Sequence, residues 1–173
     1  DVQVTTLNEL DTLLAQGNRR EIMKNRGRFI AAVQNDTKRT NDLEAVLNEV
    51  LSLEQEIAKI QGLNENNNPW GAWEISRKAQ DKFSNDNELL RLSVELGEEV
   101  SSFIRVLKKA EKLERDKHDG MSLTWYLKAK SIYPKSSYAK DGINRILNNI
   151  LPSDIDRSQI ENDIDIASPK KLE

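Results

Sequence analysis

The apolar residues of this chain recur at an interval of 50 positions, and this recurrence limits the folds that the chain can adopt. A fixed period of this length is typical of stacked supersecondary units, because each unit buries its apolar face against its neighbours. The period therefore predicts a repeat architecture. The aligned apolar triples are Leu7, Ile57 and Leu107; Leu10, Ile60 and Ala110; Leu13, Leu63 and Leu113; Val33, Phe83 and Tyr133; Val46, Leu96 and Ile146; and Val50, Val100 and Ile150.

Helical signals divide the chain into alternating short and long helices. Between the turn residues, apolar side chains recur three and four positions apart, as on one face of an α-helix. Asp36, Asp86 and Ser136 align at the 50-residue spacing, and we expect them to cap the helices that follow. These signals predict helices at about residues 6–16, 19–34, 37–62, 70–84, 87–116, 120–133 and 137–150.

We expect an all-α fold, a superhelical array of antiparallel helix pairs in which long and short helices alternate. One helical repeat domain would cover residues 1–151. It would comprise units at about 1–35, 36–85 and 86–135 and a capping helix at 136–151. The composition agrees, because 37 % apolar and 32 % charged residues suit helices that each bury one stripe.

The last residues, 152–173, differ in composition from the rest. They alternate acids with isoleucine between Asp154 and Asp165, which predicts an acidic linker or a disordered tail. Leu172 and Glu173 are typical of a cloning scar, and the chain starts at Asp1. We therefore expect a piece of a longer protein whose targeting signal lies elsewhere.

The third unit carries a motif that the other units keep only in part. In the segment 120–134, a small residue is followed by an aromatic, a Lys-Ala pair and a proline. These residues are Ser122, Tyr126, Lys128, Ala129 and Pro134, and they are preceded by the helix positions Ala110 and Leu113. The set resembles the tetratricopeptide-repeat family, although the period is about 50 residues rather than the family's usual 34.

The resemblance is clear over residues 103–150, weak over 53–100 and nearly absent before them. It implies a TPR-like α-solenoid that binds a protein or peptide in a groove, without catalysis and without a cofactor. We therefore expect a scaffold or adaptor module. The polar positions of the long helices at 37–62 and 87–116 are the expected binding surface.

Aromatic side chains offer candidate anchors for such a partner, because they often carry interface energy. Trp73 and Tyr126 fall at packing positions of the repeat, so we expect them in the core. Trp70, beside Pro69 at a helix start, and Trp125 are the candidates for partner binding.

A basic segment at residues 19–39 suggests an alternative function. Its candidate contact residues are Arg19, Arg20, Lys24 and Arg28. Such a segment could bind an acidic protein, a nucleic-acid backbone or anionic lipid. The net charge of the whole chain is only −3, which does not favour bulk nucleic-acid binding.

A second alternative is a structural domain that forms homo-oligomers. Seven-residue spacing of apolar side chains permits coiled-coil contacts between copies. The residues with this spacing are Leu43, Val50 and Ile57, and Leu89, Leu96, Phe103 and Ala110.

Several classes of chemistry find no support in the composition. The chain has no cysteine, and its one histidine, His118, lies in a predicted turn, so a transition-metal site lacks ligands. The paired acids Glu95 and Glu98, and Glu111 and Glu114, are expected to be solvated helix faces. No apolar run of about 18 residues occurs, so the sequence predicts a soluble chain without a membrane span. The compartment is left open.

Overall fold

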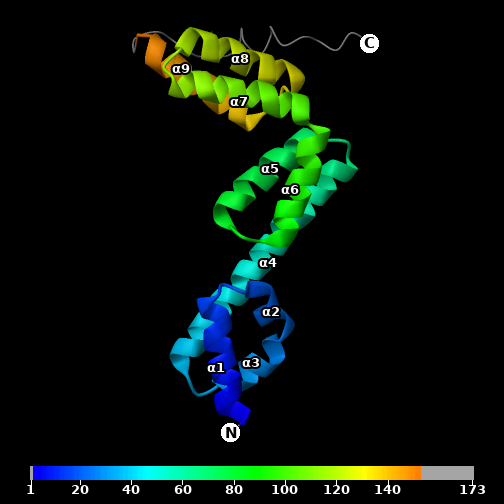
Figure 1. The fold of residues 1–173 in the computed structure, drawn as a ribbon, viewed down its shortest axis with the longest axis vertical. Coiled ribbons are helices and arrows are strands. Elements are labelled where there is room, and N and C mark those ends of the chain that lie inside the picture. Colours follow the sequence, from blue (N-terminus) through cyan, green and yellow to red (C-terminus); the bar gives the residue numbers. More distant parts are fainter. Residues whose placement is uncertain (1, 153–173) are drawn as a thin grey trace. The chain divides into compact units, whose positions relative to one another are not determined.

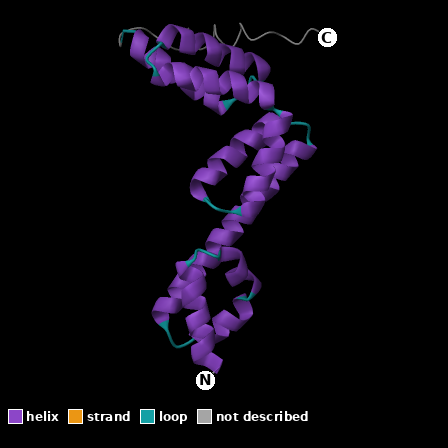
Figure 2. Ribbon diagram, viewed as in Figure 1, coloured by secondary structure: helices purple, strands orange, loops and turns teal. Residues whose placement is uncertain are grey.

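The computed structural model describes residues 2–152, and within that range every regular element is an α-helix (Figures 1 and 2). The predicted all-α class is therefore confirmed. Of the acidic linker or disordered tail predicted at 152–173, residues 153–173 lie outside the described residues. The helices are α1 (Val2–Ala15), α2 (Arg19–Lys24), α3 (Arg26–Val33), α4 (Thr37–Glu65), α5 (Pro69–Lys82), α6 (Asn87–Glu99), α7 (Ser101–Arg115), α8 (Asp119–Ile132) and α9 (Ser137–Ile150).

The chain divides into two compact units, and the boundary between them in the sequence falls within α4. The first comprises Asp1–Ala58 and the second Lys59–Glu173. This boundary falls inside the predicted unit at 36–85. The division into units of about 50 residues therefore stays a prediction from the sequence pattern. None of the helices in the described range is long and apolar enough to cross a membrane.

The first unit packs three short helices and the first part of α4 around one apolar cluster. Leu10 of α1, Ile22 of α2, Phe29 and Val33 of α3, and Leu43 of α4 are all buried together. Each helix thus contributes one apolar stripe to a shared core, as an amphipathic pattern predicts.

The single helix predicted at 19–34 is interrupted at Asn25, so this prediction was wrong in part. The Asn25 side chain donates to the Glu21 carbonyl over 3.0 Å and to the Glu21 carboxylate over 2.8 Å. Its backbone has left the helical region, with φ −102° and ψ 15°. A short polar side chain that bonds to the preceding turn competes with helix continuation, and Gly27 weakens the next turn.

The long helix predicted at 87–116 is also divided, into α6 and α7, at Val100. The Val100 backbone has φ −105° and ψ 26°, and its side chain is buried. Gly97 lies just before the break, while Ser101 and Ser102 follow it. All three have weaker helix propensity than alanine. The helix therefore loses little local stability when it breaks at Val100 and buries that side chain.

The turns after α1, α4 and α7 are the same structure, repeated every 50 residues. Gly17, Asn67 and Lys117 have φ of 64°, 58° and 61°. In each turn this residue donates to the carbonyl three positions back, and the next residue donates to the carbonyl five positions back. This pair of bonds is the Schellman motif, which satisfies carbonyls at a helix C-terminus. The 50-residue period of the sequence is thus present in the backbone.

The turns before α4, α6 and α9 repeat at the same interval. The side chain of Asp36 accepts from the Arg39 amide, Asp86 from Leu89 and Ser136 from Ala139, over 2.9 to 3.0 Å. These bonds confirm the three residues as N-caps. Each bond satisfies an amide that the first helical turn leaves without a partner.

In the second unit α5 packs on α6, while α7, α8 and α9 pack on one another. The Ser122 hydroxyl donates to the Ala110 carbonyl over 2.9 Å, which ties α8 to α7. Tyr126 is buried, which confirms the expectation that it lies in the core, and Ala129 is buried as well. Trp73 is buried as well, as expected from its place in the repeat.

Candidate partner-binding surface

Trp70, predicted as a partner anchor, lies at the start of α5 and is half-buried. Its ring stacks on Tyr133, at the end of α8, with centroids 6.2 Å apart and planes 18° from parallel. One face of the indole is therefore already used inside the second unit.

The Trp70–Tyr133 stack belongs to a larger aromatic cluster. Phe103 of α7 packs edge-on against both Trp73 and Tyr133, with centroids 6.0 and 6.1 Å away. Trp73 also contacts Tyr138 of α9 at 6.2 Å. Aromatic pairs in these geometries add about 0.5–1.5 kcal/mol each beyond burial. The cluster therefore joins α5 to the three helices that follow α6.

Arg77 covers this cluster. Its guanidinium lies 4.6 Å from the Tyr138 ring centroid and 5.6 Å from that of Trp73. It also donates to both carboxylate oxygens of Glu111, over 2.9 and 3.3 Å. These contacts tie α5 to α7 through Glu111 and to α9 through Tyr138.

Glu74 is a buried carboxylate that caps another helix. One oxygen accepts from the Ser136 hydroxyl, and the other accepts from the Ser137 amide and hydroxyl over 3.0 Å. An acidic side chain at a helix N-terminus meets unpaired amides and the positive end of the helix dipole. Glu74 of α5 thereby holds the start of α9.

Trp125, the other predicted anchor, is half-buried on α8. The Lys128 ammonium lies 4.8 Å from its ring centroid. Met121, one turn earlier, is exposed. Both predicted aromatic anchors are therefore half-buried, and they do not contact one another.

The basic residues of 19–39 face carboxylates of their own unit. Arg19 pairs with Glu49 at 2.9 Å, and Lys24 lies 3.8 Å from Glu21. Arg28 pairs with Glu9, and Arg39 pairs with Asp11 at 2.7 Å and with Asp36 at 2.6 Å. Arg20 is half-buried. These acids offset the positive charge, so the segment offers less potential for an anion than its sequence suggests.

The residues expected to form a coiled coil between copies are covered by the chain itself. Leu43, Val50, Ile57, Leu89, Leu96, Phe103 and Ala110 are all buried. A coiled-coil seam requires side chains that can enter a facing helix. The residues on which the homo-oligomer hypothesis was based are therefore not exposed for contact with a second copy.

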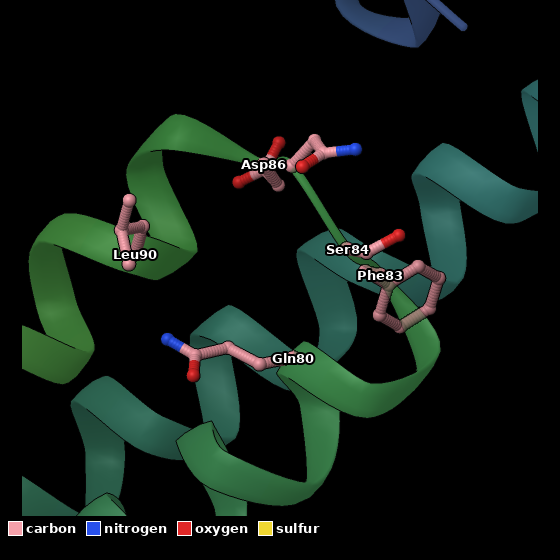
Figure 3. Close-up of a pocket in the computed structure, with 6 residues that line it drawn as sticks. Gln80, Phe83, Ser84, Asp86 and Leu90 are labelled. Atoms are coloured by element: carbon pink, nitrogen blue, oxygen red, sulfur yellow. The ribbon is translucent and has the colours of Figure 1, made fainter.

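A cavity of about 230 Å³ opens at the turn between α5 and α6 (Figure 3). Phe83 and Leu90 are its apolar lining residues, of which Phe83 is almost fully buried, and Gln80 extends from α5 toward the side of α6 that carries Leu90. Ser84, Asn85 and Asp86 of the turn complete the lining. Asn85 has φ 68°, so the turn adopts a conformation that few residues accept.

An exposed apolar pair adjoins this cavity. Leu90 and Val94 lie four residues apart on one side of α6 and are 54 % and 55 % exposed. Scattered apolar residues on a surface are ordinary, but this pair lies on one side of a helix and Leu90 also lines the cavity. The sequence holds a signal for it, because Leu90 and Val94 fall outside the buried stripe of Leu89 and Leu96.

Comparison with known proteins adds no assignment: no family model, no curated protein and no solved structure matches this chain. Within residues 2–152, no three acidic or histidine side chains come together as a group that could hold a metal ion.

Proposed function

We propose that the chain is a protein-interaction module, a scaffold or adaptor that binds a protein or peptide segment at the α5–α6 turn. The observation that carries the proposal is the exposed pair Leu90 and Val94 beside the cavity lined by Phe83. An apolar side chain of the partner would enter the cavity while its neighbours cover the pair. Polar groups of the turn would fix the orientation of the segment.

The size of the cavity favours a side chain over a free small molecule. Its volume of about 230 Å³ lies below the 300–1,000 Å³ of pockets that enclose drug-sized ligands. Complete burial of a leucine or valine contributes about 1.5–3 kcal/mol. Because Leu90 and Val94 are already about half covered, the pair would contribute about half of that range for each side chain.

The repeated turns support the wider interpretation as an array of antiparallel helix pairs, similar to the tetratricopeptide-repeat family. Identical Schellman turns follow α1, α4 and α7, and identical caps precede α4, α6 and α9. Stacked helix pairs form extended surfaces that suit protein partners. The α6 surface lies in the segment 87–116, where the sequence predicts binding through the polar positions, whereas this proposal rests on the apolar pair.

Selection from a displayed random-peptide library against the purified chain tests the proposal. We expect enriched peptides to share apolar residues three or four positions apart, and to bind in a titration by calorimetry. The variant Leu90→Ser/Val94→Ser should reduce affinity by about tenfold or more, because it removes the apolar contact.

The matched control is Met121→Ser, which removes an equally exposed apolar side chain on α8. It should leave affinity unchanged. The proposal fails if no peptide is enriched over the bare support, or if the double variant binds the selected peptides as tightly as the parent chain.

A further inference from the structure

The apolar pair of α6 continues into an acidic helix surface. Leu90, Val94 and Glu98 follow one another at intervals of four residues, so they form one line along the helix. At 1.5 Å per residue the line is about 12 Å long, which matches two to three turns of a partner helix. The cavity lies at the Leu90 end of this line, and the carboxylate lies at the other end.

Acidic residues predominate around this line. Helix α6 has four glutamates and one arginine. The arginine, Arg91, is paired with Glu95 over 2.7 Å, and both side chains are more than half exposed. Glu98 and Glu99 are exposed at the end of the helix. Helix α6, which carries this line, therefore has more acidic than basic side chains.

The cavity end carries a carboxylate as well. Asp86 lines the cavity with one carboxylate oxygen bound to the Leu89 amide. The side chains of Gln80, Ser84 and Asn85 also line the cavity, and each of them can both donate and accept hydrogen bonds. Because an ionised carboxylate only accepts, a partner group that enters beside Asp86 is favoured when it donates hydrogen bonds, as lysine and arginine do.

We propose that the occupant of this surface is a basic amphipathic segment of a partner protein. Two apolar side chains, three or four residues apart, cover Leu90 and Val94, and one of them enters the cavity. Flanking lysine or arginine side chains face Glu98 and Glu99 and the acceptors of the turn. This inference rests on the proposed function, and charge complementarity is the observation that selects the partner.

Three synthetic peptides of equal length and identical apolar positions test the partner's charge. Their polar positions are lysine and arginine, glutamate, or glutamine. Fluorescence anisotropy gives each dissociation constant at 50 and 500 mM salt. We expect the basic peptide to bind about tenfold or more tightly than the acidic one at low salt, and this preference to shrink at high salt.

A charge-reversal variant tests whether the preference for a basic peptide arises from α6. Glu98→Lys/Glu99→Lys should weaken the basic peptide severalfold and strengthen the acidic one, because each exposed ion pair changes affinity by up to about fivefold. The control Asp116→Lys/Asp141→Lys makes the same change in net charge at two exposed acids outside α6. It should leave the ratio of the two affinities unchanged.

The outcomes separate this inference from the function on which it rests. If the glutamine peptide binds as tightly as the basic one and loses affinity in Leu90→Ser/Val94→Ser, the binding surface stands and the charge preference is overturned. If none of the peptides binds, and library selection also fails, both proposals are overturned. If sedimentation shows that the chain self-associates and that the same double variant abolishes this, the occupant is a second copy, and the basic-partner proposal is wrong.

Discussion

Gly142 of α9 lies directly against the aromatic ring of Tyr126 on α8. A methyl group added at Gly142 would be 2.3 Å from Tyr126 Cζ, which is far inside van der Waals contact. The Tyr126 hydroxyl donates to Glu114 of α7, and Arg145 of α9 donates to the same carboxylate over 2.7 and 3.0 Å. Tyr126 is thus held on both sides, and α9 can approach α8 only where it has no side chain.

Gly142→Ala should therefore destabilise the second unit. The added carbon meets a buried ring that cannot move aside, so we expect the free energy of unfolding to fall by about 1–3 kcal/mol. Urea titration followed by circular dichroism measures the change. The control is Gly62→Ala in α4, where nothing lies within 4 Å of the added carbon. It should raise stability by about 0.5–1 kcal/mol, because alanine is the better helix former. Equal effects of the two changes would contradict the close contact.

Glu74→Ala should release the start of α9. The change leaves the Ser137 amide and the Ser136 hydroxyl without their acceptor, which costs about 1–3 kcal/mol. Hydrogen exchange in the first turn of α9 should accelerate with it. Glu95→Ala removes an exposed partner of Arg91 and should change stability by less than about 1 kcal/mol. Unchanged exchange at Ser137 in the Glu74 variant would show that the carboxylate is not the cap.

Two substitutions at equivalent positions of the Schellman turns should change the free energy of unfolding in opposite directions. Lys117 has a positive φ that a side chain disfavours, so Lys117→Gly should raise the free energy of unfolding by about 0.5–1 kcal/mol. Gly17→Ala forces a side chain into the same conformation and should lower it by about 1 kcal/mol. Thermal denaturation of both variants measures the pair. Shifts of the same sign would be incompatible with a shared turn geometry.

Glu114 accepts hydrogen bonds from Tyr126 and Arg145, and from these contacts we predict a loss of stability in acid. Hydrogen bonds from Arg145, and then from Tyr126, lower the pKa of the Glu114 carboxyl below its ordinary value. A carboxyl whose pKa is lower in the folded state stabilises the fold above its unfolded pKa, and this contribution is lost as the pH falls through the folded pKa. Glu114→Gln should cost about 1–2 kcal/mol at pH 7, since Arg145 is half exposed.

Denaturant titrations between pH 7 and pH 3 check this prediction. The difference in stability between the parent chain and Glu114→Gln should shrink as the pH falls below about 4, the ordinary range of glutamate. Glu54→Gln, at an exposed position of α4, supplies the background slope. A difference that stays constant across this range would rule out the ionised carboxylate as its source.

Helix ends could be predicted from the sequence because local chemistry decides them. Asp36, Asp86 and Ser136 each bond within their own first turn, so the cap can be recognised without knowledge of the fold. The same holds for the αL residue at Gly17. The breaks at Asn25 and Val100 were missed, because neither residue is a strong helix breaker and the bend at Val100 accompanies its burial.

The candidate site was harder to predict, because partners distant in the sequence decide it. Trp70 was expected at the surface, but its stacking partner Tyr133 is 63 positions away. The charge of Arg19 is offset by Glu49, on a different helix. Leu90 belongs to the proposed binding surface only because the end of α5 leaves a cavity beside it, and no local pattern encodes that cavity.

The turns at Gly17, Asn67 and Lys117 share one backbone conformation, so any of them can replace another without a change in backbone geometry. Joining Asn67 directly to His118 would delete one period. The helix before the junction and the helix after it would still be connected by a turn of the same backbone conformation. Duplication of the same stretch would add a period with equal ease. A gene that encodes such turns can gain or lose whole periods, and each product keeps helix C-termini that end in the same Schellman turn.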